Sequence, residues 1–173
     1  MATPNLAKIT LTIDEFKNNP STFPCEPYCS LVDPPNGIVV ADGAPNGSGK
    51  KQVGLDPADP TVIWMQSKNA AGGQAGPVDV EFTIAAKDAS NTYTATGSFQ
   101  FVQNSGNHDP VGGQNFKKVS VTGGKLRLRN AWKHQGHVNA PATCPRWELF
   151  IQVQDQNGML GWIDPAMENA DDM

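Results

Sequence analysis

The chain of 173 residues has a formal net charge of −4, and only 17% of its residues are charged. This balance disfavours nucleic acid and anionic membranes as partners, and we expect neither. The length predicts a single domain, residues 1–173, with room for a sizeable core. The 17 glycines and 14 prolines predict many short elements joined by turns.

The N-terminal residues lack the basic start and the apolar run of a secretory signal peptide. No segment is long and apolar enough to predict a membrane span. We therefore expect a cytoplasmic protein, with export by a leaderless route as the alternative. Three reduced thiols, Cys25, Cys29 and Cys144, fit the cytoplasm. One disulfide with a spare thiol stays open.

Apolar and polar residues alternate with a period of two, which predicts strands with one buried face. In one such stretch Leu126 and Leu128 oppose Lys125, Arg127 and Arg129. The nine expected strands are 7–16, 37–41, 61–67, 78–86, 94–102, 116–122, 125–132, 146–155 and 159–164. Residues 14–20 could instead hold a short helical turn, which Pro20 would end.

Turn residues support this prediction. Asn157-Gly158 predicts a hairpin whose two central residues have positive φ, and Gly123-Gly124 predicts a second tight turn. Long loops are expected at 20–36, 103–115 and 130–145. The predicted fold class is all-β: an immunoglobulin-like β-sandwich of about seven to nine strands with long Pro/Gly-rich loops.

Residues 44–51, APNGSGKK, resemble a phosphate-binding loop because Gly-Lys follows a strand-like run. Such a loop needs Ser or Thr after the lysine as a magnesium ligand, and position 51 is Lys. It also needs a following helix, which Pro57 and Pro60 disfavour. We therefore expect a surface loop between two strands.

Three loop histidines, His108, His134 and His137, are the candidate metal ligands, with Cys144 as a further donor. His134 and His137 are three residues apart, but no helix holds both rings on one side. Solvated loop histidines are the alternative, and we predict no cofactor. A metal-dependent enzyme that uses these histidines remains one possible function.

The basic residues Lys125, Arg127 and Arg129 point to one side of their predicted strand. They either protect an edge strand from pairing or form a patch for an anionic ligand. Trp132 at the strand end is the candidate for stacking on a sugar. An anionic or glycan ligand, and with it a lectin-like module, is therefore a second possible function.

Other residues that could serve a glycan site are less favourable. Trp64, Trp147 and Trp162 lie in apolar runs and are expected in the core. Asp56 and Asp59 could hold calcium, but they lack the dense spacing of oxygen donors that a strong calcium site has.

The run 147–169, WELFIQVQDQNGMLGWIDPAMEN, resembles the end of the AidA/PixA family of bacterial inclusion-body proteins. In that family a strand and a hairpin precede an aromatic-rich segment that closes on Asp-Pro, here residues 161–165. The strand ending in Ile13-Asp14 and the run 59–67, DPTVIWMQS, are similar to the family's first strand and its tryptophan strand. The resemblance implies a bacterial β-sandwich that is stored or assembled in quantity, and it transfers no site residue.

The function predicted first is therefore non-enzymatic, acting by self-assembly or binding, with further copies of the chain as partners. Ser105, His108 and Asp109 have the residue types of a hydrolytic triad. No GxSxG elbow accompanies them, which disfavours a hydrolase.

Overall fold

The computed structural model describes residues 5–13, 16–18, 29–31, 37–44, 51–66, 77–103, 116–130, 146–163 and 165–170. These residues form thirteen strands and no helix, so the fold is all-β as predicted. The strands are β1 (Asn5–Ile13), β2 (Phe16–Asn18), β3 (Cys29–Leu31), β4 (Ile38–Gly43), β5 (Val53–Leu55), β6 (Val62–Gln66), β7 (Val78–Ala86), β8 (Tyr93–Gln103), β9 (Phe116–Thr122), β10 (Lys125–Asn130), β11 (Arg146–Asp155), β12 (Leu160–Ile163) and β13 (Ala166–Ala170). None of the described residues belongs to a helix that could cross a membrane.

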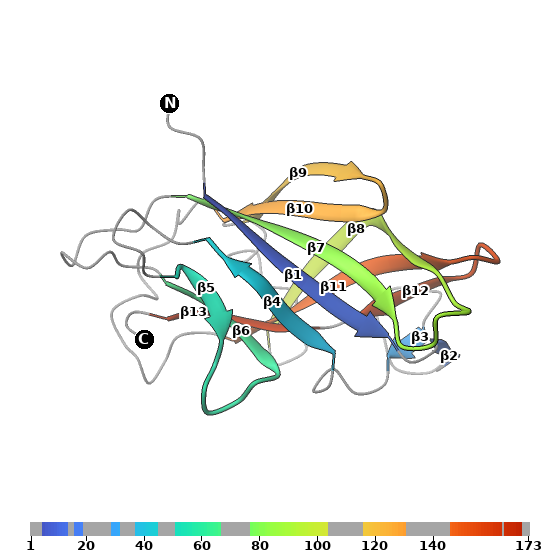
Figure 1. Cartoon of the computed structure of the whole chain (residues 1–173), viewed down its shortest axis with the longest axis horizontal. Helices are drawn as coiled ribbons and strands as arrows, with labels where there is room; N and C mark the ends of the chain where they lie inside the picture. The colour runs from blue at the N-terminus through green and yellow to red at the C-terminus, as the bar shows by residue number, and fades with distance from the viewer. Residues whose placement is uncertain are drawn as a thin grey trace.

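The strands form two large sheets and one small one (Figure 1). The five-stranded sheet has the order β4-β1-β7-β10-β9. The six-stranded sheet has the order β12-β11-β13-β6-β5, with β8 also paired to β11. The small sheet is the antiparallel pair β2–β3. Pairing is parallel in β1–β7 and β13–β6 and antiparallel elsewhere.

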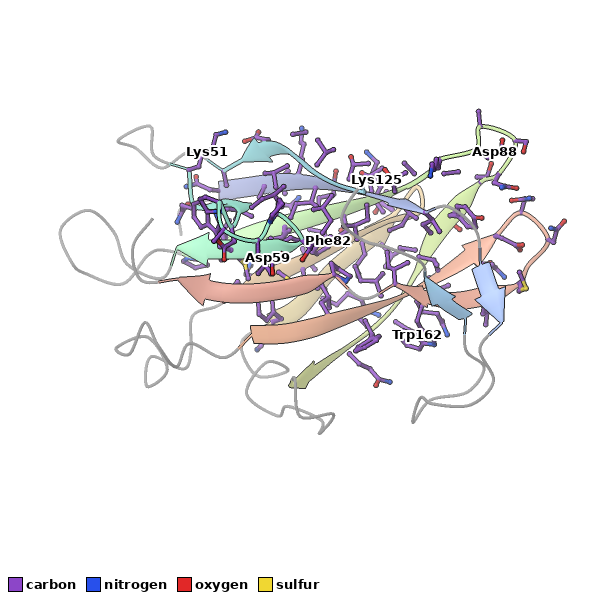
Figure 2. All side chains as sticks on the ribbon, turned by 90° about the horizontal axis from the view of Figure 1, so that it is seen from below. Lys51, Asp59, Phe82, Asp88, Lys125 and Trp162 are labelled. Carbon is purple, nitrogen blue, oxygen red and sulfur yellow. The ribbon has the colours of Figure 1, made fainter. Side chains whose placement is uncertain are left out.

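The two large sheets share one hydrophobic core. The strand alternation directs Phe82, Leu126 and Leu128 inward from the five-stranded sheet, and all three are fully buried. Leu149 and Ile151 of β11 meet them from the six-stranded sheet and are fully buried too. Figure 2 shows Phe82 among the side chains that fill the space between the layers.

All nine predicted strands are present, and four short ones were not predicted: β2, β3, β5 and β13. The helical turn expected at 14–20 is wrong for its central residues, because Phe16–Asn18 form β2 and pair with β3. A three-residue strand depends on its partner for backbone hydrogen bonds, so its own pattern does not reveal it.

The two predicted tight turns differ in geometry. Gly123 and Gly124 have φ of 57° and 73°, as expected for a two-residue hairpin turn with positive φ at both positions. In the β11–β12 hairpin only Gly158 has a positive φ, of 84°. The expected positive φ of Asn157 is therefore wrong. The Asp155 carboxylate accepts hydrogen bonds from the backbone N–H groups of Asn157 (2.9 Å) and Met159 (2.7 Å), which stabilises a longer loop.

The segment that resembles a phosphate-binding loop connects two strands. β4 precedes it and β5 begins at Val53, where a nucleotide-binding loop would need a helix. Gln52 donates its backbone N–H to the Gly43 carbonyl at 2.9 Å and so ties the two ends together. This agrees with the predicted connection between strands, of which residues 45–50 lie outside the described part.

Candidate functional site

The predicted basic residues lie on the outer surface of the five-stranded sheet. We call this surface the charged face and define it by Asp79 and Glu81 of β7 and Lys125, Arg127 and Arg129 of β10. Register places Arg127 opposite Glu81 and Arg129 opposite Asp79. Because β9 lies beyond β10, β10 is not an edge strand, and protection of an edge does not explain its charges.

Asp79 is the centre of the charged face. Its carboxylate accepts hydrogen bonds from Arg129 Nε (2.6 Å, to Oδ1) and Nη2 (3.0 Å, to Oδ2). Arg127 donates from Nε to Oδ2 (2.9 Å), and its Nη2 forms an ion pair with the same oxygen at 2.7 Å. Asp79 is fully buried even though it lies on the outer face. The two guanidinium groups therefore cover the carboxylate and neutralise it where solvent does not reach.

The electrostatics of this cluster follow from its geometry. Burial alone would raise the pKa of Asp79, but the hydrogen bonds and positive charges of Arg129 and Arg127 outweigh burial and lower it below its ordinary value. The hydrogen bond to Asp79 raises the pKa of Arg129 in turn. Two guanidinium groups share one carboxylate, so the cluster keeps one net positive charge.

Lys125 and Glu81 form the second, looser part of the charged face. Their charged atoms are 3.7 Å apart, and their side chains are 47% and 23% exposed. Figure 2 labels Lys125 on this sheet. A pair this exposed is weakly held, so the ammonium group of Lys125 can turn toward a bound anion. The charged face can therefore present fixed guanidinium groups beside one movable ammonium group.

Four large apolar side chains are exposed among the described residues: Val39 (56%), Val119 (42%), Val121 (39%) and Met159 (42%). Val39 belongs to β4, and Val119 and Val121 belong to β9, so three of the four lie on the two edges of the five-stranded sheet. Sequence reasoning missed them because alternation identifies strands but does not show which strands become edges. The alternation of valine with lysine and serine in β9 was the available signal.

The aspartates considered as calcium ligands stabilise turns instead. Asp56 Oδ1 accepts the backbone N–H of Ala58 at 2.8 Å. Asp59 Oδ1 accepts the N–H (3.2 Å) and the hydroxyl (2.6 Å) of Thr61. Within the described ranges, no three His, Cys, Asp or Glu side chains are placed to hold a metal ion.

The remaining predicted site residues are not brought together in the described part of the chain. His108, His134, His137, Cys144 and Trp132 all lie outside it, as do Cys25 and the loops that carry these residues. The metal site, the disulfide and the sugar-stacking role of Trp132 therefore stay predictions.

The tryptophans expected in the core are less buried than predicted where their side chains are described. Trp64 and Trp162 are half-buried. Trp64 lies over Gly54 and donates its indole N–H to the Leu55 carbonyl at 2.7 Å. The Trp64 indole thus covers β5 and holds it beside β6.

No protein-family model matches this chain, and no curated protein matches it either. The similarity of residues 147–169 to the AidA/PixA family accordingly remains an expectation from the sequence.

Proposed function

We propose that the protein is non-enzymatic and acts by self-association through the edges of its five-stranded sheet. One observation carries this proposal: the exposed valines lie on the edge strands β4 and β9. An edge strand offers unpaired backbone N–H and C=O groups, and apolar side chains beside them favour addition of another strand. Association would bury the exposed area of Val39, Val119 and Val121.

Two sequence predictions support the same function. We assign the two large sheets to an immunoglobulin-like sandwich, a fold with two open sheets and therefore with edges. The resemblance of residues 147–169 to the AidA/PixA inclusion-body proteins supports a bacterial protein that accumulates and assembles.

Sedimentation velocity and light scattering over a range of protein concentrations test this proposal. We expect the mean mass to rise with concentration and the rise to weaken in Val39→Ser and Val119→Ser. Met159→Ser is the matched control, because Met159 is equally exposed but lies in the β11–β12 turn. A wild-type protein that stays monomeric at every concentration would contradict the proposal.

Binding of an anionic glycan on the charged face is a second candidate function. It is favoured by the buried carboxylate of Asp79, which holds Arg127 and Arg129 in fixed positions and so lowers the entropy lost on binding. Calorimetry should detect a sulfated glycan but not its neutral analogue, with binding that weakens as salt increases. Lys125→Gln should weaken binding and leave the core unchanged, and Trp132→Phe tests the predicted stacking. Equal heats for both glycans would exclude this function.

A further inference from the structure

We infer that self-association joins β4 of one copy to β9 of the next in antiparallel orientation, so that the five-stranded sheet continues from copy to copy. This inference rests on the proposed self-association and specifies which surfaces meet. β4 has six residues and β9 has seven, so each edge can cover most of the other, although the Gly43 carbonyl at the end of β4 is already bonded to the Gln52 N–H. The edges lie on opposite sides of the same sheet (Figure 1).

The charges of the two strands favour this pairing over pairing of like edges. β4 contains one acidic residue, Asp42, and no basic residue, whereas β9 contains Lys117 and Lys118 and no acidic residue. A β9–β9 contact would gather four lysines and a β4–β4 contact two aspartates. Only a β4–β9 contact combines opposite charges, and like charges across an interface oppose association.

The positions of these charges determine the strand direction. Asp42 lies near the end of β4 and Lys117 near the start of β9. Antiparallel strands bring such positions opposite each other. Asp42 is exposed and pairs in register with Lys8, and Lys117 is exposed and pairs with Arg129 of the charged face. Both side chains therefore lie on the outer face.

The irregularities of the two strands match as well. Each strand has one extra residue against its neighbour, Ala41 in β4 and Val119 in β9. When Asp42 lies opposite Lys117, each strand has its one extra residue within the paired stretch, so the two strands stay in register. Ile38 then lies opposite Val121. These two apolar side chains point toward the core side of their strands, where Ile38 is already buried and Val121 is 39% exposed. The contact would extend the core across the junction.

This contact is heterologous, since it joins two different surfaces. Copies therefore add head to tail, and the assembly is an open filament unless the rotation between copies closes a ring. Each added copy leaves one free β4 edge and one free β9 edge, so growth continues from both ends.

Charge exchange between the edges tests the inference in the full chain. We expect Asp42→Lys alone and Lys117→Asp alone each to weaken association at least about tenfold, because both place like charges opposite each other. The double variant Asp42→Lys/Lys117→Asp should associate like the wild type. An equimolar mixture of the two single variants should also associate, because every β4–β9 contact between the variants is then complementary.

Sedimentation velocity measures the association of all of these proteins, and Lys87→Asp is the control variant. Lys87→Asp makes the same charge change as Lys117→Asp, but just after β7 and away from both edge strands. It should therefore associate like the wild type. Association of the mixture also shows that the single variants are folded. If the wild type associates but the single variants do so equally well, the β4–β9 contact is wrong and self-association stands. If the wild type is monomeric throughout, both proposals fail.

Discussion

At the scale of single residues, Asp79 combines a position on the outer face of the sheet with complete burial. The alternation in β7 correctly assigns it to the outer face, where a carboxylate would ordinarily be solvated. The structure buries it completely, because two arginines from β10 lie over it. Arginine side chains cover neighbouring surface with their stems while their charged ends stay at the boundary with water. The burial of Asp79 therefore comes from the register of β10 on β7.

We expect Asp79→Asn to lower the free energy of unfolding by about 1.5–3 kcal/mol, because it removes charge-assisted hydrogen bonds at a buried position. Glu81→Gln, the same chemical change on the same strand and face, should cost less than about 1 kcal/mol because its ion pair is exposed. Urea unfolding of both variants measures the difference. Equal losses would show that the arginines do not depend on Asp79.

Acid should remove the contribution of Asp79. Its folded-state pKa lies below the ordinary value of 3.8, so the unfolded chain binds the proton more tightly. The stabilisation is therefore complete above pH 3.8 and is lost as the pH falls through the folded-state pKa. The stability difference between wild type and Asp79→Asn should be constant near neutral pH and shrink below pH 3.8. Hydrogen bonds from Ser90 also lower the pKa of Asp88. Because Asp88 titrates in both proteins, its contribution cancels in the stability difference. A difference that persists in acid would contradict this assignment.

At the scale of elements, β8 and β9 meet where the two large sheets approach each other. Register between β8 and β11 shifts around Gly97, which has a φ of 95°. A Cβ on Gly97 would lie 2.5 Å from Val121 Cγ2, and Lys118 Nζ reaches the Gly97 carbonyl at 3.4 Å. The glycine thus serves two needs, a backbone conformation that L-residues rarely adopt and close approach of β9.

Gly97→Ala should destabilise the fold by about 1–3 kcal/mol, since it combines an unfavourable φ with a steric clash. Adding Val121→Ala should recover the steric part only. Gly123→Ala is the control, because its φ is 57° and no atom lies within 4 Å of the added Cβ. Val121→Ala should therefore give no recovery in the Gly123→Ala background. Thermal unfolding compares the four variants, and an equal response in both backgrounds would exclude the clash.

At the scale of the whole molecule, connections between the sheets hold the layers together. β7 belongs to the five-stranded sheet and β8, which follows it, to the six-stranded sheet. Gln156, in the β11–β12 turn, accepts the Thr92 N–H at 2.9 Å and donates to Asn91 Oδ1 at 3.1 Å. The tip of one hairpin therefore holds the connection between β7 and β8. A shared core and these links predict that the two sheets unfold together.

Leu128→Ala tests this cooperativity. Leu128 is fully buried in β10, so the substitution should lower the free energy of unfolding by about 2–5 kcal/mol. In a Trp132→Phe background the remaining tryptophans, at 64, 147 and 162, all belong to the six-stranded sheet. Their fluorescence should report the same destabilisation as far-UV circular dichroism. A fluorescence midpoint that does not move would show that the sheets unfold separately.

The strands themselves were predictable, because alternation of apolar and polar residues records which face of a strand is dry. All nine expected strands occur, and Leu126 and Leu128 point inward as expected. Gly123-Gly124 was equally predictable, since few residues tolerate positive φ at both positions of a turn. The site was less predictable: Lys125, Arg127 and Arg129 were identified from the sequence, but their partner Asp79 was not.

Local sequence thus specifies the strands, their inward faces and the glycine turn, because these depend on neighbouring residues and on backbone sterics. Pairing partners, strand order and edges appear only in the folded chain. They arise from contacts between segments far apart in sequence, such as Arg129 with Asp79 or Gly97 with Val121. β10 became an inner strand and β4 and β9 became edges for this reason, and the surfaces proposed for self-association follow from that order.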